Sequence, residues 1–93
     1  MTPDIAHDTT RHRFETTIEG EHCTLDYQFD ADTMTITHVV VPDPVSRRGI
    51  AAALMRAALE SAREHGWHVV PECPYAAYYV NENPEWSGLI VRH

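Results

Sequence analysis

A chain of 93 residues is long enough for one domain with a modest hydrophobic core and too short for two such domains. Its formal net charge is −7 and it contains no lysine, which argues against general nucleic-acid binding, because that needs clustered cations facing phosphates. No apolar run can span a membrane, no signal peptide or lipidation motif is present, and two cysteines are too few for a disulfide scaffold, so we expect a cytoplasmic protein without membrane contact.

The first half of the chain predicts a flexible tail followed by three antiparallel strands. Residues 1–10 are polar and aperiodic, so we expect a tail there and a single domain over residues 11–93. Two alternating segments follow, whose shared faces hold Phe14, Thr16 and Ile18, and then Cys23, Leu25, Tyr27 and Phe29. A tight turn over residues 30–32 leads into a third strand, residues 33–41, which Pro42 and Pro44 end.

The second half predicts a long helix that packs on this sheet. It begins near Arg48 and ends at Gly66, and its apolar residues Ile50, Leu54, Met55, Ala58, Leu59 and Ala62 recur at helical spacing. A short strand over residues 67–71 should lie parallel to the third strand, followed by a short helix over 75–81 and a last strand over 89–91. The predicted fold is α+β, with a mostly antiparallel mixed sheet, one long helix and one short helix.

The connection into the long helix has the composition of a phosphate cradle. Gly49 lacks a Cβ, so an anion can approach the backbone, and the free N–H groups of the first helical turn would point at it. Arg47 and Arg48 add positive charge, and a guanidinium can bind a phosphate through two parallel hydrogen bonds. A diphosphate would fit this connection. The alternative from these residues is a plain connection with two solvated arginines.

Together these features resemble the GNAT superfamily of acetyl-coenzyme A dependent N-acetyltransferases. The matching motifs are Val41-Pro42, Arg48-Gly49-Ile50-Ala51, Leu54, Ala57-Ala58-Leu59, Gly66, Val70-Pro71-Glu72-Cys73-Pro74-Tyr75, Tyr79 and Asn83-Pro84-Glu85-Trp86. They are most similar to a small stand-alone group with a V-P-x-C-P-[YF] motif, and the resemblance runs from about residue 11 to the end. It implies a trimmed GNAT fold that lacks the usual first strand and the early helices, which help to build the acceptor site in larger members.

The resemblance implies acetyl-coenzyme A as co-substrate. The backbone of Val39, Val40 and Val41 would pair with the pantetheine amides as a further strand would. The residues that would hold the pyrophosphate are Arg47, Arg48, Gly49, Ile50, Ala51 and Ala52. Ser46 stands where the loop of the superfamily usually opens with Arg or Gln, so one possible side-chain donor is missing.

Acetyl transfer needs a neutral amine, a donor for the oxyanion and a proton for the leaving thiolate. The resemblance points to Cys73 either as a nucleophile that takes the acetyl group or as the acid that protonates the leaving thiolate. The alternative is that Cys73 is a buried structural thiol. Tyr79 is the other candidate acid. It is preferred to Tyr75 because the group often has phenylalanine at the position of Tyr75. The alternative is that Tyr79 is a core aromatic. His38 could act as a base through water, but its alternation favours a partly buried histidine.

The resemblance implies one of two functions from different classes. The first is an N-acetyltransferase that acts on an amine of a small molecule or a peptide. The second is an acetyl-coenzyme A binding module or sensor with little or no catalysis, acting through a partner. The motif G-x-x-x-x-G-K-[ST] is absent, which disfavours an unrelated nucleotide binder, and the spacing of His and Cys predicts no metal site. We expect a monomer or a weak homodimer, in which a second copy covers the sheet edge left by the missing first strand.

Overall fold

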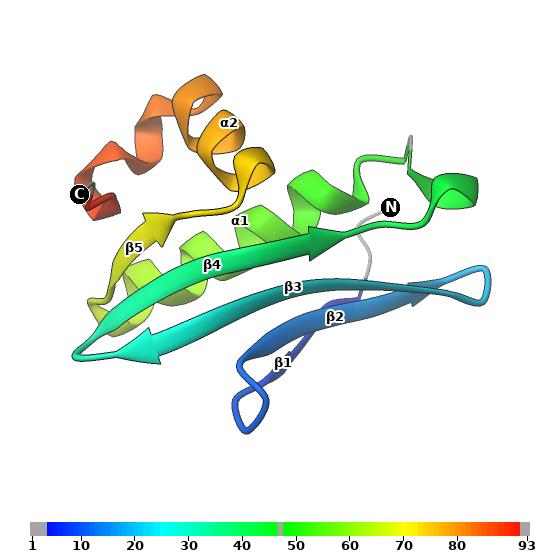
Figure 1. The fold of residues 1–93 in the computed structure, drawn as a ribbon, viewed down its shortest axis with the longest axis horizontal. Coiled ribbons are helices and arrows are strands. Elements are labelled where there is room, and N and C mark those ends of the chain that lie inside the picture. Colours follow the sequence, from blue (N-terminus) through cyan, green and yellow to red (C-terminus); the bar gives the residue numbers. More distant parts are fainter. Residues whose placement is uncertain (1–3, 47, 92–93) are drawn as a thin grey trace.

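A computed structural model describes residues 4–46 and 48–91, which form one five-stranded sheet with helices (Figure 1). The strands lie in chain order: β1 (Ala6–Asp8), β2 (Arg13–Ile18), β3 (Glu21–Asp30), β4 (Thr33–Val40) and β5 (His68–Pro71). The first four are antiparallel, and β5 is parallel to β4. The helices are α1 (Ile50–His65) and α2 (Pro74–Glu82), with 3-10 turns η1 (Asp43–Val45) and η2 (Pro84–Leu89). The predicted α+β class is therefore confirmed.

The long helix α1 covers one face of the sheet, and Figure 1 shows it passing behind β4. Its fully buried residues are the ones that the helical spacing selects: Ile50, Leu54, Met55, Ala58, Leu59 and Ala62. They share one core with Leu25, Met34, Ile36 and Val69 of the sheet. Gly66 ends the helix in the left-handed conformation, with φ 73°, and its N–H donates to the carbonyls of Ala62 and Arg63.

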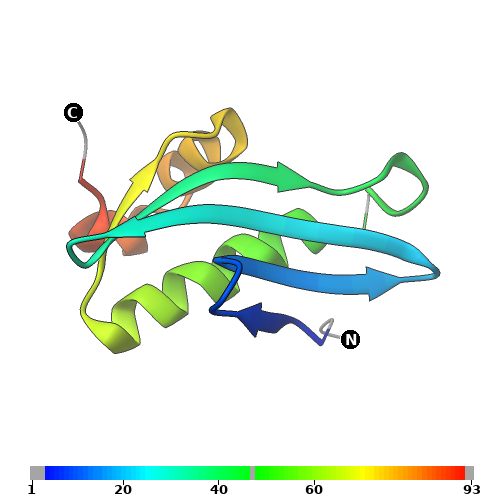
Figure 2. The ribbon, with the colours of Figure 1, turned by 60° about the horizontal axis from the view of Figure 1, so that its bottom comes forward.

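Strand β1 contradicts the predicted tail, because Ala6–Asp8 pair antiparallel with residues 13–15 of β2. The ring of His7 stacks on Phe14 with centroids 4.0 Å apart, and its Nε2 lies 2.6 Å from the hydroxyl of Tyr27. Figure 2 shows β1 beside β2 at one edge of the sheet, so this part of the edge is not left open. Three residues are too few to show an alternating pattern. Residues 1–3 of the expected tail lie outside the described residues.

The last predicted strand, over residues 89–91, is also wrong. Leu89 ends η2, and Ile90 makes an isolated parallel bridge to Val69, next to a hydrogen bond of 2.8 Å from the Val91 N–H to the Val69 carbonyl. The apolar run over residues 89–91 has the composition of a strand and lies beside β5. Because η2, which begins at Pro84, extends to Leu89, little extended chain remains to form one.

Candidate functional site

The central feature of the site is a splay between the parallel strands β4 and β5. Their pairing runs from Thr33 and His68 to Ile36 and Pro71 and stops there. The N–H groups of Glu72 and Cys73 then both donate to the Ile36 carbonyl, at 3.1 and 3.0 Å, which turns the chain away into α2. The rest of β4, residues 37–40, pairs with β3 alone in the described structure. One edge of this half of β4 is therefore open to a ligand that pairs like a strand.

A β-bulge lies at the start of the splay. His38 pairs with Asp26 and Ile36 pairs with Tyr27, so Thr37 is the extra residue on β4, and its hydroxyl donates to the Asp26 carbonyl at 3.3 Å. The bulge reverses the alternation of the strand. Ile36 is fully buried, but His38 is exposed and Val40 is 52% exposed. The expectation that His38 is partly buried is therefore wrong, because it assumed an uninterrupted period of two.

At the end of β4, the chain enters α1 through Gly49. This residue is the N-cap, with φ 73° and ψ 18°, and the first helical bond runs from the Ala53 N–H to its carbonyl at 3.0 Å. Among the described residues, no side chain caps the helix, and no acidic residue lies in its first turn. The N–H groups of Ile50, Ala51 and Ala52 therefore have no acceptor within the helix and lie at the positive end of its dipole. This arrangement suits a phosphate.

The space around Gly49 is open as well. Apart from its chain neighbours, no heavy atom of the described residues would lie within 4 Å of a Cβ placed there, so the glycine is required by its left-handed backbone rather than by crowding. The start of α1 lies near the end of β4 (Figures 1 and 2), so one elongated ligand could contact both. A flexible arm along the strand and an anion at the helix would match the predicted cofactor.

Of the two arginines predicted to bind the pyrophosphate, the structure describes Arg48 alone. Arg48 forms an ion pair with Glu19, which lies in the turn between β2 and β3. Sequence reasoning missed Glu19, because it precedes Arg48 by almost thirty positions and no local pattern joins them. Arg47 lies outside the described residues.

Cys73 lies where the two strands separate and is the N-cap of α2. Its N–H is held by the Ile36 carbonyl, and its own carbonyl accepts from the Ala77 N–H at 3.0 Å, so both sides of its backbone are fixed. The residue is 9% exposed. The structure thus brings Cys73 next to the bulge and the open edge of β4. This position fits a reactive thiol at the splay, and its burial also fits the structural alternative.

Two tyrosines of α2, Tyr75 and Tyr79, are half-buried, and their ring centroids lie 6.3 Å apart. Burial raises the pKa of Tyr79, and the nearby Glu85 carboxylate adds to this, so the phenol stays protonated at neutral pH and can act as an acid. Burial also raises the pKa of Tyr75. Tyr79 follows Cys73 by six residues, or about 9 Å along the helix axis. The role of Tyr79 stays a prediction.

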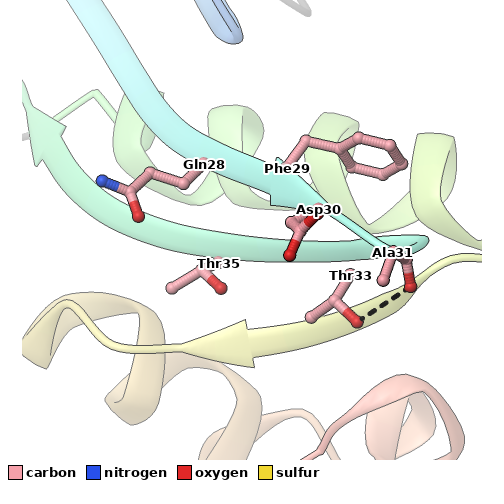
Figure 3. A pocket seen from close by; sticks show the side chains of 6 residues that line it. All are labelled: Gln28, Phe29, Asp30, Ala31, Thr33 and Thr35. Carbon is pink, nitrogen blue, oxygen red and sulfur yellow. Dashed lines mark hydrogen bonds between the residues drawn. The ribbon is translucent and has the colours of Figure 1, made fainter.

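A separate hollow of about 380 Å³ lies at the start of β4, over the β3–β4 turn (Figure 3). It is lined by Gln28, Phe29, Asp30, Ala31, Thr33 and Thr35. Its residues lie at the opposite end of β4 from the cradle, so this hollow is distinct from the predicted cofactor site. No sequence pattern indicated it.

Over residues 4–46 and 48–91, no group of three or more His, Cys, Asp or Glu side chains could hold a metal ion. In that same part of the chain, no helix has the length and apolar character needed to cross a membrane.

The sequence is similar to a known protein family and to several named proteins. A family described as GCN5-related N-acetyl-transferase matches residues 13–89. Protein NATD1 of Xenopus tropicalis and of Mus musculus is 34% identical over 83 residues, which cover 86% of this chain and 76% of each relative. Protein NATD1 of Homo sapiens is equally similar, with 74% of its length covered.

The fold also matches a GCN5-like protein of Staphylococcus aureus that was solved by NMR. The TM-score is 0.78 at 19% identity, and the match covers 99% of this chain and 91% of that one. At this identity the likeness concerns the fold alone.

Proposed function

Because the chain belongs to the family of GCN5-related N-acetyltransferases, we propose that it binds acetyl-coenzyme A at the splay and transfers the acetyl group to an amine of a small molecule or a peptide. The observation that carries this proposal is that the open half of β4 and the uncapped N-terminus of α1 lie at the same end of the molecule (Figures 1 and 2). A ligand that is strand-like at one end and anionic at the other suits both.

In this proposal the pantetheine arm lies along the backbone of Val39, Val40 and Val41. The pyrophosphate is held by the first-turn N–H groups and the arginines, a set that comprises Arg47, Arg48, Gly49, Ile50, Ala51 and Ala52. The fit of the pyrophosphate is supported by the backbone N–H groups of Ile50, Ala51 and Ala52, which have no acceptor within the helix. The first turn also has no carboxylate that would repel the phosphates.

Cys73 gives the proposal two possible chemical routes. In the first, its thiolate attacks the thioester carbonyl, the bond to the coenzyme sulfur breaks, and the amine then takes the acetyl group from the cysteine, whose thiol is restored. In the second, the amine attacks directly and the bond to the coenzyme sulfur breaks. The thiol of Cys73 or the phenol of Tyr79 protonates the departing thiolate, and the proton that the nitrogen releases restores that acid. Both routes need the thioester at the point where β4 and β5 separate.

A second candidate function is a coenzyme-binding module with little catalysis. It is favoured by the short N-terminal part, because no helix precedes β2 in the described structure, whereas early helices help to build the acceptor site in larger members of the superfamily. Such a protein would bind the coenzyme through the same residues and act through a partner.

Calorimetric titration of acetyl-coenzyme A and coenzyme A into the wild-type protein and Cys73→Ser tests the proposal. We expect one-to-one binding in both proteins and loss of amine acetylation in the variant. Cys23→Ser is the matched control, since it removes the other, fully buried thiol. Unchanged turnover in Cys73→Ser would reject both roles of Cys73 and leave Tyr79 as the acid. No binding at millimolar coenzyme would reject the site.

Mass spectrometry after incubation with acetyl-coenzyme A alone separates the two cysteine routes. The nucleophile route leaves an acetyl group on Cys73, whereas the acid route leaves the thiol free. Since the chain contains no lysine, any acetyl-lysine in the assay belongs to an acceptor molecule.

A further inference from the structure

The hairpin between β2 and β3 brings a negative charge to the cradle. Its turn consists of Glu19, with φ 50°, and Gly20, with φ 79°, which is the paired left-handed conformation of a tight hairpin turn. The Glu19 carboxylate pairs with the guanidinium of Arg48, the residue just before the N-cap Gly49. The described arginine of the cradle is therefore already bound to an anionic group.

We propose that Glu19 competes with the pyrophosphate of coenzyme A for Arg48 and so limits the affinity of the site; this rests on the proposed function. A carboxylate and a phosphate bind the same N–H edge of a guanidinium through paired donors. The incoming phosphate displaces Glu19, whose charge then remains close to an anionic ligand. Glu19 thus acts on the cofactor through Arg48, as a positioning residue.

The exposure of the pair determines how large the effect is. The side chain of Arg48 is 53% exposed and that of Glu19 is 58% exposed. Exposed ion pairs are weak and are screened by salt, so Arg48 can exchange partners readily. Neutralising Glu19 should therefore strengthen coenzyme binding by up to about fivefold, the factor that an exposed pair can supply.

Glu21 provides a matched control on the same hairpin. It is the first residue of β3, two positions after Glu19, and the ion pair of Arg48 is with Glu19. Glu21→Gln makes the same change in net charge at nearly the same place. A gain confined to Glu19→Gln would therefore come from the contact rather than from the overall charge.

The experiment is calorimetric titration of coenzyme A, and of pantetheine without phosphates, into wild-type protein, Glu19→Gln, Glu21→Gln, Arg48→Gln and the Glu19→Gln/Arg48→Gln double variant. We expect Glu19→Gln to bind coenzyme A up to about fivefold more tightly at low salt and pantetheine unchanged. The gain should shrink at high salt, be smaller in Glu21→Gln, and vanish when Arg48→Gln is already present.

Two results would overturn the competition while leaving the site intact: coenzyme binding that is unchanged or weaker in Glu19→Gln, and a gain of equal size in the Arg48→Gln background. The absence of coenzyme binding in every protein at millimolar concentration would instead reject the proposed function and this inference together. The two failures are distinguishable because only the first leaves wild-type binding measurable.

Discussion

At the scale of single residues, Gly49 and Gly66 form a natural pair for comparison. Both have φ 73°, one at the start of α1 and the other at its end, and a Cβ at either position would have no heavy atom within 4 Å. Their shared requirement is the left-handed backbone, which any residue with a side chain adopts at a cost of about 1 kcal/mol. Only Gly49 lies beside the proposed pyrophosphate position.

We predict that Gly49→Ala and Gly66→Ala lower the free energy of unfolding by similar amounts, about 1 kcal/mol each. Coenzyme A binding should weaken by about tenfold or more in Gly49→Ala, since the added methyl group takes up space in the cradle, and should stay unchanged in Gly66→Ala. Urea unfolding measures the first quantity and calorimetry the second. Equal coenzyme affinity in the two variants would contradict the cradle.

At the scale of elements, β1 is held by its pairing with β2 and by the side-chain contacts of one histidine. His7 stacks on Phe14 and bonds to Tyr27, and its pKa is lowered by burial first and then by the nearby His65. Asp8 opposes this shift and His12 adds to it. Protonating His7 places a charge in this partly buried cluster, so acid should weaken the attachment of β1 to the sheet.

This predicts a pH-dependent stability with a definite sign. The unfolded chain takes up the His7 proton near the ordinary pKa of 6.5, above the lowered pKa of the folded state. Stability is therefore full above that value and falls as the pH drops through it towards the folded-state pKa. Urea midpoints at about pH 8 and about pH 5 should differ more for the wild-type protein than for His7→Phe. Equal differences would remove His7 as the cause.

At the scale of the whole molecule, one core joins the sheet to both helices. Buried residues from β2 to β5 pack with α1, α2 and Trp86 of η2, whose ring lies 4.6 Å below the guanidinium carbon of Arg63. The radius of gyration is 12.4 Å. Such a domain should unfold in one cooperative transition. The proposed coenzyme contacts both β4 and the start of α1, so its binding should stabilise the whole core.

We predict that coenzyme A at about one hundred times its dissociation constant stabilises the protein by about 2.7 kcal/mol. For a domain of this size, that corresponds to a rise in Tm of roughly 10–20 °C. Thermal unfolding followed by circular dichroism measures the shift, which should grow with the logarithm of coenzyme concentration. The same concentration of coenzyme A should have a smaller effect on Gly49→Ala. No shift in the wild-type protein would contradict the site.

The sequence by itself determined the strands β2 to β5, the helix α1 with its buried face, and the glycine at the start of that helix. These features follow from the spacing of apolar residues and from backbone preferences, both of which act over a few neighbouring positions. The motifs that carry the family resemblance are likewise short stretches of neighbouring residues.

The tertiary structure alone decided the remaining features. Strand β1 pairs with β2 and adds the contact of His7 with Tyr27, Arg48 forms an ion pair with Glu19, and at the splay one carbonyl of Ile36 accepts two N–H groups from beyond β5. The bulge at Thr37 arises from pairing with β3 and reverses the face of His38. Each joins residues far apart in sequence, where the geometry of the packed sheet selects the partner and local pattern carries no signal.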